Sequence, residues 1–396
     1  MDFEVRTDLS REDFEAYYHF NQKVHAPFVY WFGKIGGIAA IIVALALTID
    51  ILVNRLWTNR EVMTPYCIFI ALLIPFFVLC ALQMKKNGLK KETASWFALL
   101  AVPLCFLLSR LGFCFLIIDH IIGADDFGMV FRTWEGGFLL WGAIGGLLLA
   151  AKLSGKITRQ SGAVIADSAV IPACLMIVAI RLLCGLLFED MGIGFRLDYW
   201  FNPEETDFAF RVSLWPLEDW SFFERFPFAV ENYYGDWCWA VFVLQALWAG
   251  ITALLVSRPK AAPGGKAARF IILFSCGSIV LESMLHSGEI VHLPWLGFVK
   301  ANQILCAAAL LAVAIVCLRR LEKGSRLRPA VILFVQFLAA IGLIIVLEFT
   351  TFEKKIEMIE WLPADACHLI MIGLCAWIAL AFRSLWKKAY IERSSV

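Results

Sequence analysis

The amino-acid sequence predicts an all-α polytopic membrane protein with about ten transmembrane helices. Of its 396 residues, 61% are hydrophobic and only 17% are charged, and 33 Phe and 15 Trp give a large aromatic content. A water-soluble domain is closer to half apolar and a quarter charged, so most of this chain belongs in lipid. The formal net charge of +1 gives no electrostatic basis for a nucleic-acid partner.

The apolar segments are long enough to form transmembrane helices, each of which needs roughly 20 predominantly apolar residues. By this criterion the spans lie at 34–54, 64–84, 96–118, 136–151, 163–188, 237–257, 268–286, 299–318, 329–350 and 364–382. The fourth span is short and rich in glycine (WGAIGG), which predicts close helix packing or a tilted, partly broken helix. Most of the twelve cysteines fall within these spans, where thiols behave as small hydrophobic side chains.

The distribution of charge predicts which links lie inside the cell, because Lys and Arg collect on the cytoplasmic side of a membrane protein. With the even-numbered links and the C-terminal tail taken as inner, these segments carry 20 basic residues against three acids. The outer links carry nine basic residues against twenty acids. We therefore expect both termini in the cytoplasm. The longest link, 189–236, then lies outside, and its aromatic and acidic composition predicts a folded head region.

Apart from Lys34, Arg269 and Lys300 at the very ends of spans, which we assign to the flanking segments, only two basic residues fall inside the predicted spans, and they lie at the same depth. Arg110 and Arg181 are in the outer halves of the third and fifth spans, near the outer-side carboxylates Glu189 and Glu282. Charges inside a membrane are costly and face a protein interior or a watery cavity. A guanidinium group suits a lipid phosphate, and a carboxylate can orient it or accept a proton. The alternative is that each arginine pairs with a carboxylate and only holds helices together.

Other polar residues leave further possibilities open. His286 follows Glu282 by one helical turn and is expected on the same helix face. Asp50 and Glu348 have no evident partners and keep a small-molecule transporter as a third reading. The sequence shows no Cys/His metal spacing, no glycine-rich phosphate loop and no nucleophilic serine motif, so we expect neither a metal nor a cofactor.

Seven motifs occur in order along residues 64–320. They are SRLGFCFLIID (109–119), TWEGGFLLWGAIGG (133–146), the basic link KLSGKITRQSG (152–162) followed by Asp167, IRLLCGLLFE (180–189), RFPFAVEN (225–232), FSCGSIVLESMLHSGE (274–289) and NQILCA (302–307). This part of the chain resembles the bacterial prolipoprotein diacylglyceryl transferases. The motifs come in the same order, the links lie on the same sides of the membrane, and the long outer link is in the same place. That family has seven spans and an outer head domain between the fourth and fifth, corresponding to spans two to eight here.

The resemblance implies four parts of the chain. These are a cytoplasmic N-terminal segment (1–33), an extra transmembrane helix (34–60), a seven-helix core like that of the family with the head region 189–236 inside it (61–320), and two extra C-terminal transmembrane helices with a cytoplasmic tail (321–396). It also implies a place in the bacterial cytoplasmic membrane.

The resemblance further implies an activity. The family transfers the diacylglyceryl group of phosphatidylglycerol to the thiol of a lipobox cysteine in a secreted preprolipoprotein, and it releases glycerol phosphate. Phosphatidylglycerol and preprolipoprotein signal segments are therefore the expected partners. The candidate catalytic residues are Arg181, Glu189, Glu282 and His286, and the candidate substrate-binding residues are Arg110, Gly142, Trp141 and Tyr66.

Several motif positions differ from the family pattern. Trp141 stands at the signature histidine, Ser278 at an arginine, Cys184 at an asparagine and Phe226 at a histidine. An indole cannot accept a proton and a serine carries no charge, so the alternative expectation is a non-catalytic relative that binds phospholipid or lipoprotein signal segments. His286 is the candidate to replace a lost group, because it is expected near the same depth.

Overall fold

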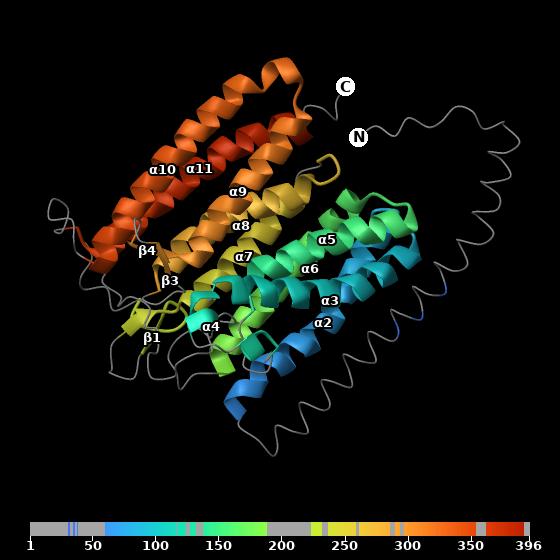
Figure 1. The fold of residues 1–396 in the computed structure, drawn as a ribbon, viewed down its shortest axis with the longest axis horizontal. Helices are drawn as coiled ribbons and strands as arrows, with labels where there is room; N and C mark the ends of the chain where they lie inside the picture. Colours follow the sequence, from blue (N-terminus) through green and yellow to red (C-terminus); the bar gives the residue numbers. More distant parts are fainter. Residues whose placement is uncertain are drawn as a thin grey trace, which may run out of the picture.

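The structure is a computed structural model. It describes residues 31, 35, 38, 60–116, 118–123, 127–131, 138–187, 223–231, 237–258, 261–285, 290–293, 297–353 and 362–391. Most of the described residues are helical, and the long helices lie side by side in one bundle (Figure 1).

The described elements are long helices with short connections. The long helices are α2 (Arg60–Lys86), α3 (Lys91–Leu116), α5 (Leu140–Thr158), α6 (Gly162–Leu187), α7 (Val241–Ser257), α8 (Gly265–Ser283), α9 (Ala301–Arg320), α10 (Leu327–Glu353) and α11 (Ala364–Tyr390). The short ones are α4 (Ile118–Gly123) and the 3-10 helices η1 (Phe127–Val130) and η4 (Lys323–Ser325). Two antiparallel hairpins pair β1 (Ala229–Glu231) with β2 (Trp237–Trp239), and β3 (Ile290–Leu293) with β4 (Gly297–Lys300).

Six of the described helices are long and apolar enough to cross a membrane: α3, α5, α6, α9, α10 and α11. α7 is a shorter apolar helix. Large apolar side chains such as Leu254 and Phe334 are exposed on the helix surfaces, as expected for positions that face lipid. The predicted all-α, multi-pass membrane fold is therefore confirmed, while the total number of spans stays a prediction.

Helices occupy the ranges predicted for spans two to ten, with two corrections. Residues 237–239, predicted to open the sixth span, pair as strand β2 instead, and helix α7 begins at Val241. The fourth span is neither short nor broken, because α5 begins at Leu140 and continues to Thr158 without interruption. Its glycines serve close packing, as described below.

Parts of the predicted organisation lie outside the described residues. These are the N-terminal segment 1–33 and the first span 34–54, apart from residues 31, 35 and 38, and most of the head region 189–236. The four-part division of the chain therefore stays a prediction.

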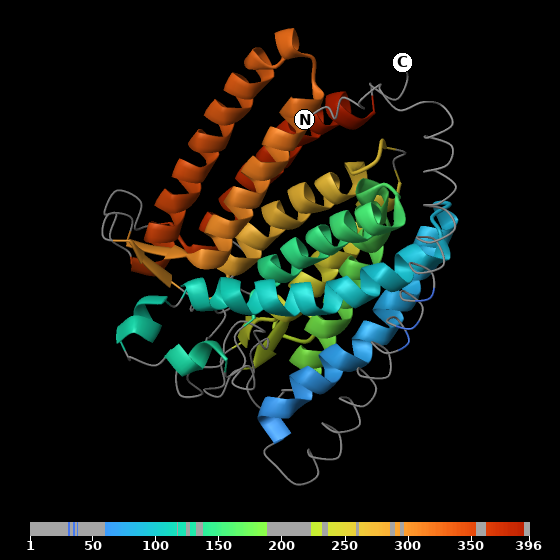
Figure 2. The same ribbon diagram turned by 45° about the vertical axis from the view of Figure 1, so that its right-hand side comes forward.

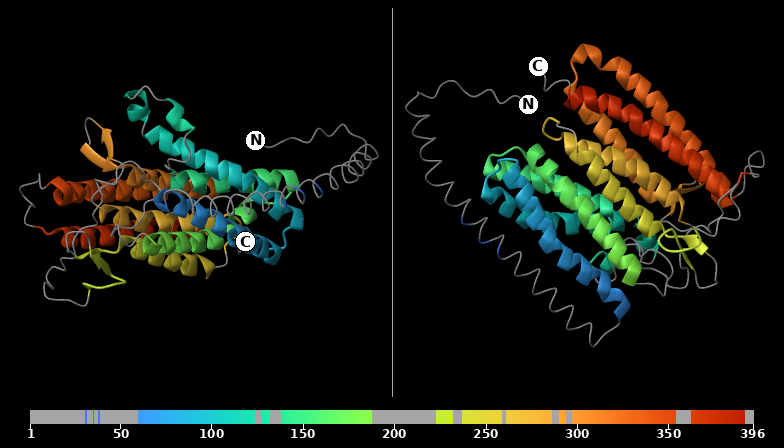
Figure 3. Two further views of the ribbon diagram at one scale, coloured as in Figure 1. Left: turned by 90° about the horizontal axis from the view of Figure 1, so that it is seen from below. Right: turned by 180° about the vertical axis from the view of Figure 1, so that it is seen from behind.

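The bundle consists of two groups of helices with α7 between them. α2, α3, α5 and α6 pack around buried side chains such as Phe97 and Ile165. α8, α9, α10 and α11 pack around Leu310 and Met371. A smaller cluster around Val256 joins α5, α6, α7 and α8. Figures 2 and 3 show the first group in blue to green and the second in gold to red.

The two ends of the bundle differ in chemistry. Because successive helices alternate in direction, one end gathers the last turns of α3, α6, α8 and α10 and the first turns of α5, α9 and α11. Both β-hairpins lie at this end, which we call the hairpin end (Figure 1). Basic residues of the predicted inner links, such as Lys86, Lys156 and Arg319, lie at the opposite end. Which end faces the cytoplasm stays a prediction.

At the opposite end, one carboxylate on α6 fixes the start of α8. Asp167 accepts hydrogen bonds from the backbone N–H of Gly264 (2.8 Å) and of Ala267 (2.9 Å). The first N–H groups of a helix lack intrahelical partners, and a negative charge stabilises that end. Gly264 has φ 87°, a conformation that favours glycine. The contact sets the position of α8 along the bundle, and with it the position of Glu282 at the other end of that helix.

Candidate functional site

Arg110 is buried at the hairpin end, in the last two turns of α3, with 4% of its surface exposed. Its Nε donates a hydrogen bond to the carbonyl oxygen of Val130 (3.2 Å). The guanidinium carbon lies 5.6 Å from the centre of the Phe113 ring and 6.0 Å from that of Phe138. A cation held against aromatic faces keeps a fixed direction, and a guanidinium group carries five N–H donors in all.

Close contact between α3 and α5 places the next candidate residue. A Cβ at Gly142 would lie 2.4 Å from the carbonyl oxygen of Leu108, and one at Gly146 would lie 2.6 Å from the Cα of Cys105. Only glycine allows two helix backbones to approach this closely. Gly142 is thus a packing residue that sets Trp141 beside the end of α3, and its role in substrate binding stays a prediction.

One polar chain joins α5, α9 and α8 at the hairpin end. Trp141 Nε1 donates to Asn302 Oδ1 (3.0 Å), and Asn302 Nδ2 donates to Glu282 Oε2 (2.9 Å). A primary amide offers both an acceptor and donors, so Asn302 serves an indole and a carboxylate together. The structure therefore brings two predicted site residues together through a third that the sequence analysis did not assign. The available signal was the polar pair Asn302–Gln303 opening an apolar span.

Lys300 is a second buried cation at this end, in addition to Arg110. It is one of the nine basic residues expected on the outer side, but only 3% of its surface is exposed. Its Nζ donates to the carbonyl oxygens of Glu282 (2.7 Å) and Leu285 (2.6 Å). These carbonyls belong to the last turn of α8 and the residues after it, where a positive charge is favoured. The expectation that only Arg110 and Arg181 are embedded was therefore incomplete.

The last two helices also reach this end. Gln303 donates from its side chain to the Glu348 carboxylate on α10 and to the carbonyl oxygen of Ile279 on α8. Glu348, which had no evident partner in the sequence, thus has one in the structure. On α11, Nε2 of the buried His368 lies 3.2 Å from the carbonyl oxygen of Ser283, next to Glu282.

The remaining predicted residues are less closely connected in the described part of the chain. Arg181 is half-buried in the last two turns of α6, at the hairpin end. Tyr66 lies on α2, and its side chain is not among those the structure describes. Glu189 and His286 lie outside the described residues. Arg110 and Trp141 border the same apolar cluster, which contains Phe113 and Leu139.

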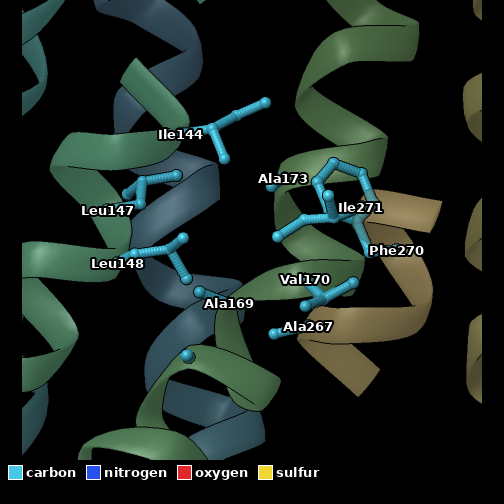
Figure 4. A pocket seen from close by; sticks show the side chains of 10 residues that line it. Ile144, Leu147, Leu148, Ala169, Val170, Ala173, Ala267, Phe270 and Ile271 are labelled. Carbon is cyan, nitrogen blue, oxygen red and sulfur yellow. The ribbon is translucent and has the colours of Figure 1, made fainter. Parts of the chain in front are cut away.

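An apolar pocket lies between α5, α6 and α8 (Figure 4). Ile144 and Leu148 line it from α5, Val170 from α6, and Phe270 and Ile271 from α8. Ile144 is one helical turn from Trp141, whose ring also meets Phe274 edge to face at 6.2 Å. The pocket therefore begins beside the polar chain and runs toward the opposite end of the bundle.

The described residues bring together positive charge, a carboxylate and an apolar pocket. Arg110, Lys300 and Arg181 provide cations at one end, and Glu282 provides a group able to accept a proton. Such an arrangement suits an anionic headgroup with an apolar tail. Within the described part of the chain, no group of three or more His, Cys, Asp or Glu is arranged to hold a metal ion.

A known family matches most of the helical bundle. The model of a family described as prolipoprotein diacylglyceryl transferase matches residues 56–319. The matched segment contains α2 to α9, with Arg110, Trp141, Arg181 and Glu282, while α10 and α11 follow it.

Proteins from Listeria are similar over the same length. One from Listeria monocytogenes serovar 1/2a is 23% identical over 263 residues, which cover 65% of this chain and 86% of that protein. Another from Listeria monocytogenes serotype 4b is 24% identical over 264 residues, and one from Listeria innocua is 23% identical over 264 residues, each with the same two coverages. All three are named phosphatidylglycerol–prolipoprotein diacylglyceryl transferase.

Proposed function

Because the chain belongs to the prolipoprotein diacylglyceryl transferase family, we propose that it transfers the diacylglyceryl group of phosphatidylglycerol to a thiol at the outer face of a bacterial membrane. The acceptor would be the lipobox cysteine of a secreted preprolipoprotein or a related group. The observation that carries the proposal is the meeting of Glu282 and Trp141 through Asn302, at the same end of the bundle as Arg110 and Arg181.

The positive charges would act on the phosphate. In the transfer, the sulfur of the acceptor forms a bond to the glyceryl carbon, the bond from that carbon to the phosphate oxygen breaks, and glycerol phosphate leaves. Guanidinium groups already fixed in place, as Arg110 is by Val130 and its aromatic neighbours, stabilise the charge of such a leaving group. Arg181, at the same end, would supply a second guanidinium.

A carboxylate would take the proton of the acceptor, since the thiolate and not the thiol is the nucleophile. Glu282 is the best-supported candidate, because Asn302 fixes its Oε2 at the hairpin end. Glu189 and His286 are further candidates for the same task.

The apolar pocket would hold part of an acyl chain. The pocket begins at Ile144, beside Trp141, and its lining on α8 lies deeper: with a rise of about 1.5 Å per residue, Phe270 is roughly 15–20 Å from Glu282 along the helix. A lipid headgroup at Glu282 with its tail toward Phe270 would be oriented as in the outer leaflet. Both termini would then be cytoplasmic, and the head region between α6 and α7 would lie outside.

The test is a transfer assay on the purified full-length protein in liposomes that contain phosphatidylglycerol and a lipobox peptide. We expect release of glycerol phosphate and a peptide heavier by one diacylglyceryl group. Arg181→Ala should lose both the product and the phosphatidylglycerol that co-purifies, whereas Arg319→Ala, an exposed arginine at the opposite end, should lose neither. Undiminished lipid retention in Arg181→Ala would contradict the assignment of the site.

A second candidate function is binding of phospholipid or lipoprotein signal segments without catalysis. The observation that favours it is the indole of Trp141, which is a donor only and is already hydrogen-bonded to Asn302, at the position of the family's signature histidine. Lipid that is retained through Arg181 with no peptide product would support this function over the transferase.

A further inference from the structure

We infer that α10 and α11, the two helices that follow the family-like core, complete the candidate site, with Glu348 and His368 as positioning residues for the Glu282 carboxylate. The inference rests on the proposed function for its activity readout, and a second readout below is independent of that function.

The end of α8 receives hydrogen bonds from two neighbouring elements. The final carbonyl groups of a helix have no intrahelical partner and must be satisfied by other groups when they are buried. Here the carbonyls of Glu282 and Leu285 accept from Lys300, and that of Ser283 is reached by His368 Nε2. The turn that carries Glu282 is thus held by α11 as well as by the residue that precedes α9.

The residue after the amide that binds Glu282 is hydrogen-bonded to α10. Asn302, which binds the carboxylate, is followed by Gln303, whose side chain donates to Glu348 on α10 and to the carbonyl of Ile279 on α8. Glu348 therefore fixes the start of α9 against α8, one turn before Glu282. Through Gln303, α10 thus supports the turn of α8 that carries Glu282, in addition to the support from α11.

The buried charged side chains between these helices lie at one end. Along most of their length, α8 to α11 pack through an apolar cluster that includes Ile272, Leu310 and Met371. The buried Lys, Asp, Glu and His side chains described in this group are all at the hairpin end: Glu282, Lys300, Glu348, Asp365 and His368. Apolar packing would be enough to hold two added helices, and polar groups inside a membrane protein are costly. Because Lys300 and His368 bond to the end of α8, and Glu348 reaches α8 through Gln303, these three groups serve the turn that carries Glu282.

The experiment pairs polar variants with apolar controls on the same helices. His368→Leu and Glu348→Leu remove the hydrogen bonds, while His368→Gln and Glu348→Gln keep a donor and an acceptor. Cys375→Ala on α11 and Ile344→Ala on α10 remove buried apolar atoms from the same interface without touching the polar end.

Two measurements are made on the full-length protein in liposomes with phosphatidylglycerol and a lipobox peptide. Hydrogen–deuterium exchange should rise in residues 279–285 of His368→Leu and Glu348→Leu, but not in the two apolar controls. In the transfer assay, kcat should fall by about 10- to 100-fold in the Leu variants with KM for phosphatidylglycerol unchanged, because a displaced catalytic group lowers the chemical step. The Gln variants should recover most of this loss.

The outcomes separate the two proposals. Unchanged exchange in both Leu variants, or an equal rise in the apolar controls, would overturn the positioning role. If wild type shows no transfer while the exchange result holds, the proposed function fails and the positioning of Glu282 stands. Glu348→Leu tests the same turn of α8 from another helix. The positioning role can therefore still be tested if His368→Leu fails to fold.

Discussion

Trp141 and Glu282, on helices α5 and α8, are joined by the single side chain of Asn302, with hydrogen bonds of 3.0 and 2.9 Å. The motif resemblance places this indole at the family's signature histidine, and the two hydrogen bonds connect it to Glu282. On that resemblance, the position has changed from a proton acceptor to a donor and is still connected to the site.

Asn302→Leu should lower transfer by roughly 10- to 100-fold. The variant leaves an indole donor and a carboxylate without their shared partner, and each loss of this kind costs about 1–3 kcal/mol. Release of glycerol phosphate by the variant in liposomes measures the effect. Ile304→Ala, a lipid-exposed change on the same helix, serves as the control. Equal activity in the two variants would mean that Asn302 does not orient Glu282 for the reaction.

Gly142→Ala should destabilise the protein, whereas Gly145→Ala should not. A methyl group at Gly142 meets the α3 backbone at 2.4 Å, while one at Gly145 meets no atom within 4 Å. Overpacking costs about 1–3 kcal/mol, and alanine in an open helical position is favoured over glycine by about 0.5–1 kcal/mol. Thermal unfolding in detergent should show a lower Tm for Gly142→Ala alone. If the Tm falls equally in both variants, the close contact between α3 and α5 is not the cause of the destabilisation.

Much of the fold could be predicted from the sequence, because the length and apolar content of a span are local properties. The ranges of the long helices follow from runs of apolar residues, and errors occur where structure depends on contacts between segments. Residues 237–239 look like the start of a helix, but they pair with β1. The WGAIGG segment indicates either close packing or a break, and only the position of α3 decides between them.

The candidate site could be predicted only in part. Arg110, Trp141 and Glu282 are recognisable from their motifs and depth, but their connection depends on Asn302, which is 161 residues from Trp141. Lys300 stands at the edge of a span, and its burial follows from the end of α8 folding over it. Glu348 seemed to have no partner, because Gln303 lies on another helix. Such tertiary contacts leave no periodic signal in a single sequence.

Asp167→Ala should weaken the start of α8, since two backbone N–H groups would lose their acceptor in a partly buried place. Loss of a capping side chain costs about 0.5–2 kcal/mol, and Asp167→Asn should cost less because it keeps one acceptor oxygen. Hydrogen–deuterium exchange of residues 261–268 should rise in the Ala variant. If exchange in residues 261–268 is unchanged while the whole protein loses stability, Asp167 does not stabilise the start of α8 in particular.

Engineered cysteines should show that the hairpin end faces outward. Glu224, between α6 and α7, and Lys90, between α2 and α3, are both exposed and lie in links of opposite predicted side. A membrane-impermeant maleimide should label Glu224→Cys, or a cysteine placed within 200–220, in intact cells. It should label Lys90→Cys only after permeabilisation, because the basic links stay in the cytoplasm. The unaltered chain gives the background, since its described cysteines are buried or half-buried. The reverse pattern would place Arg110 and Glu282 at the inner leaflet, where a lipobox cysteine of a secreted protein does not reach them.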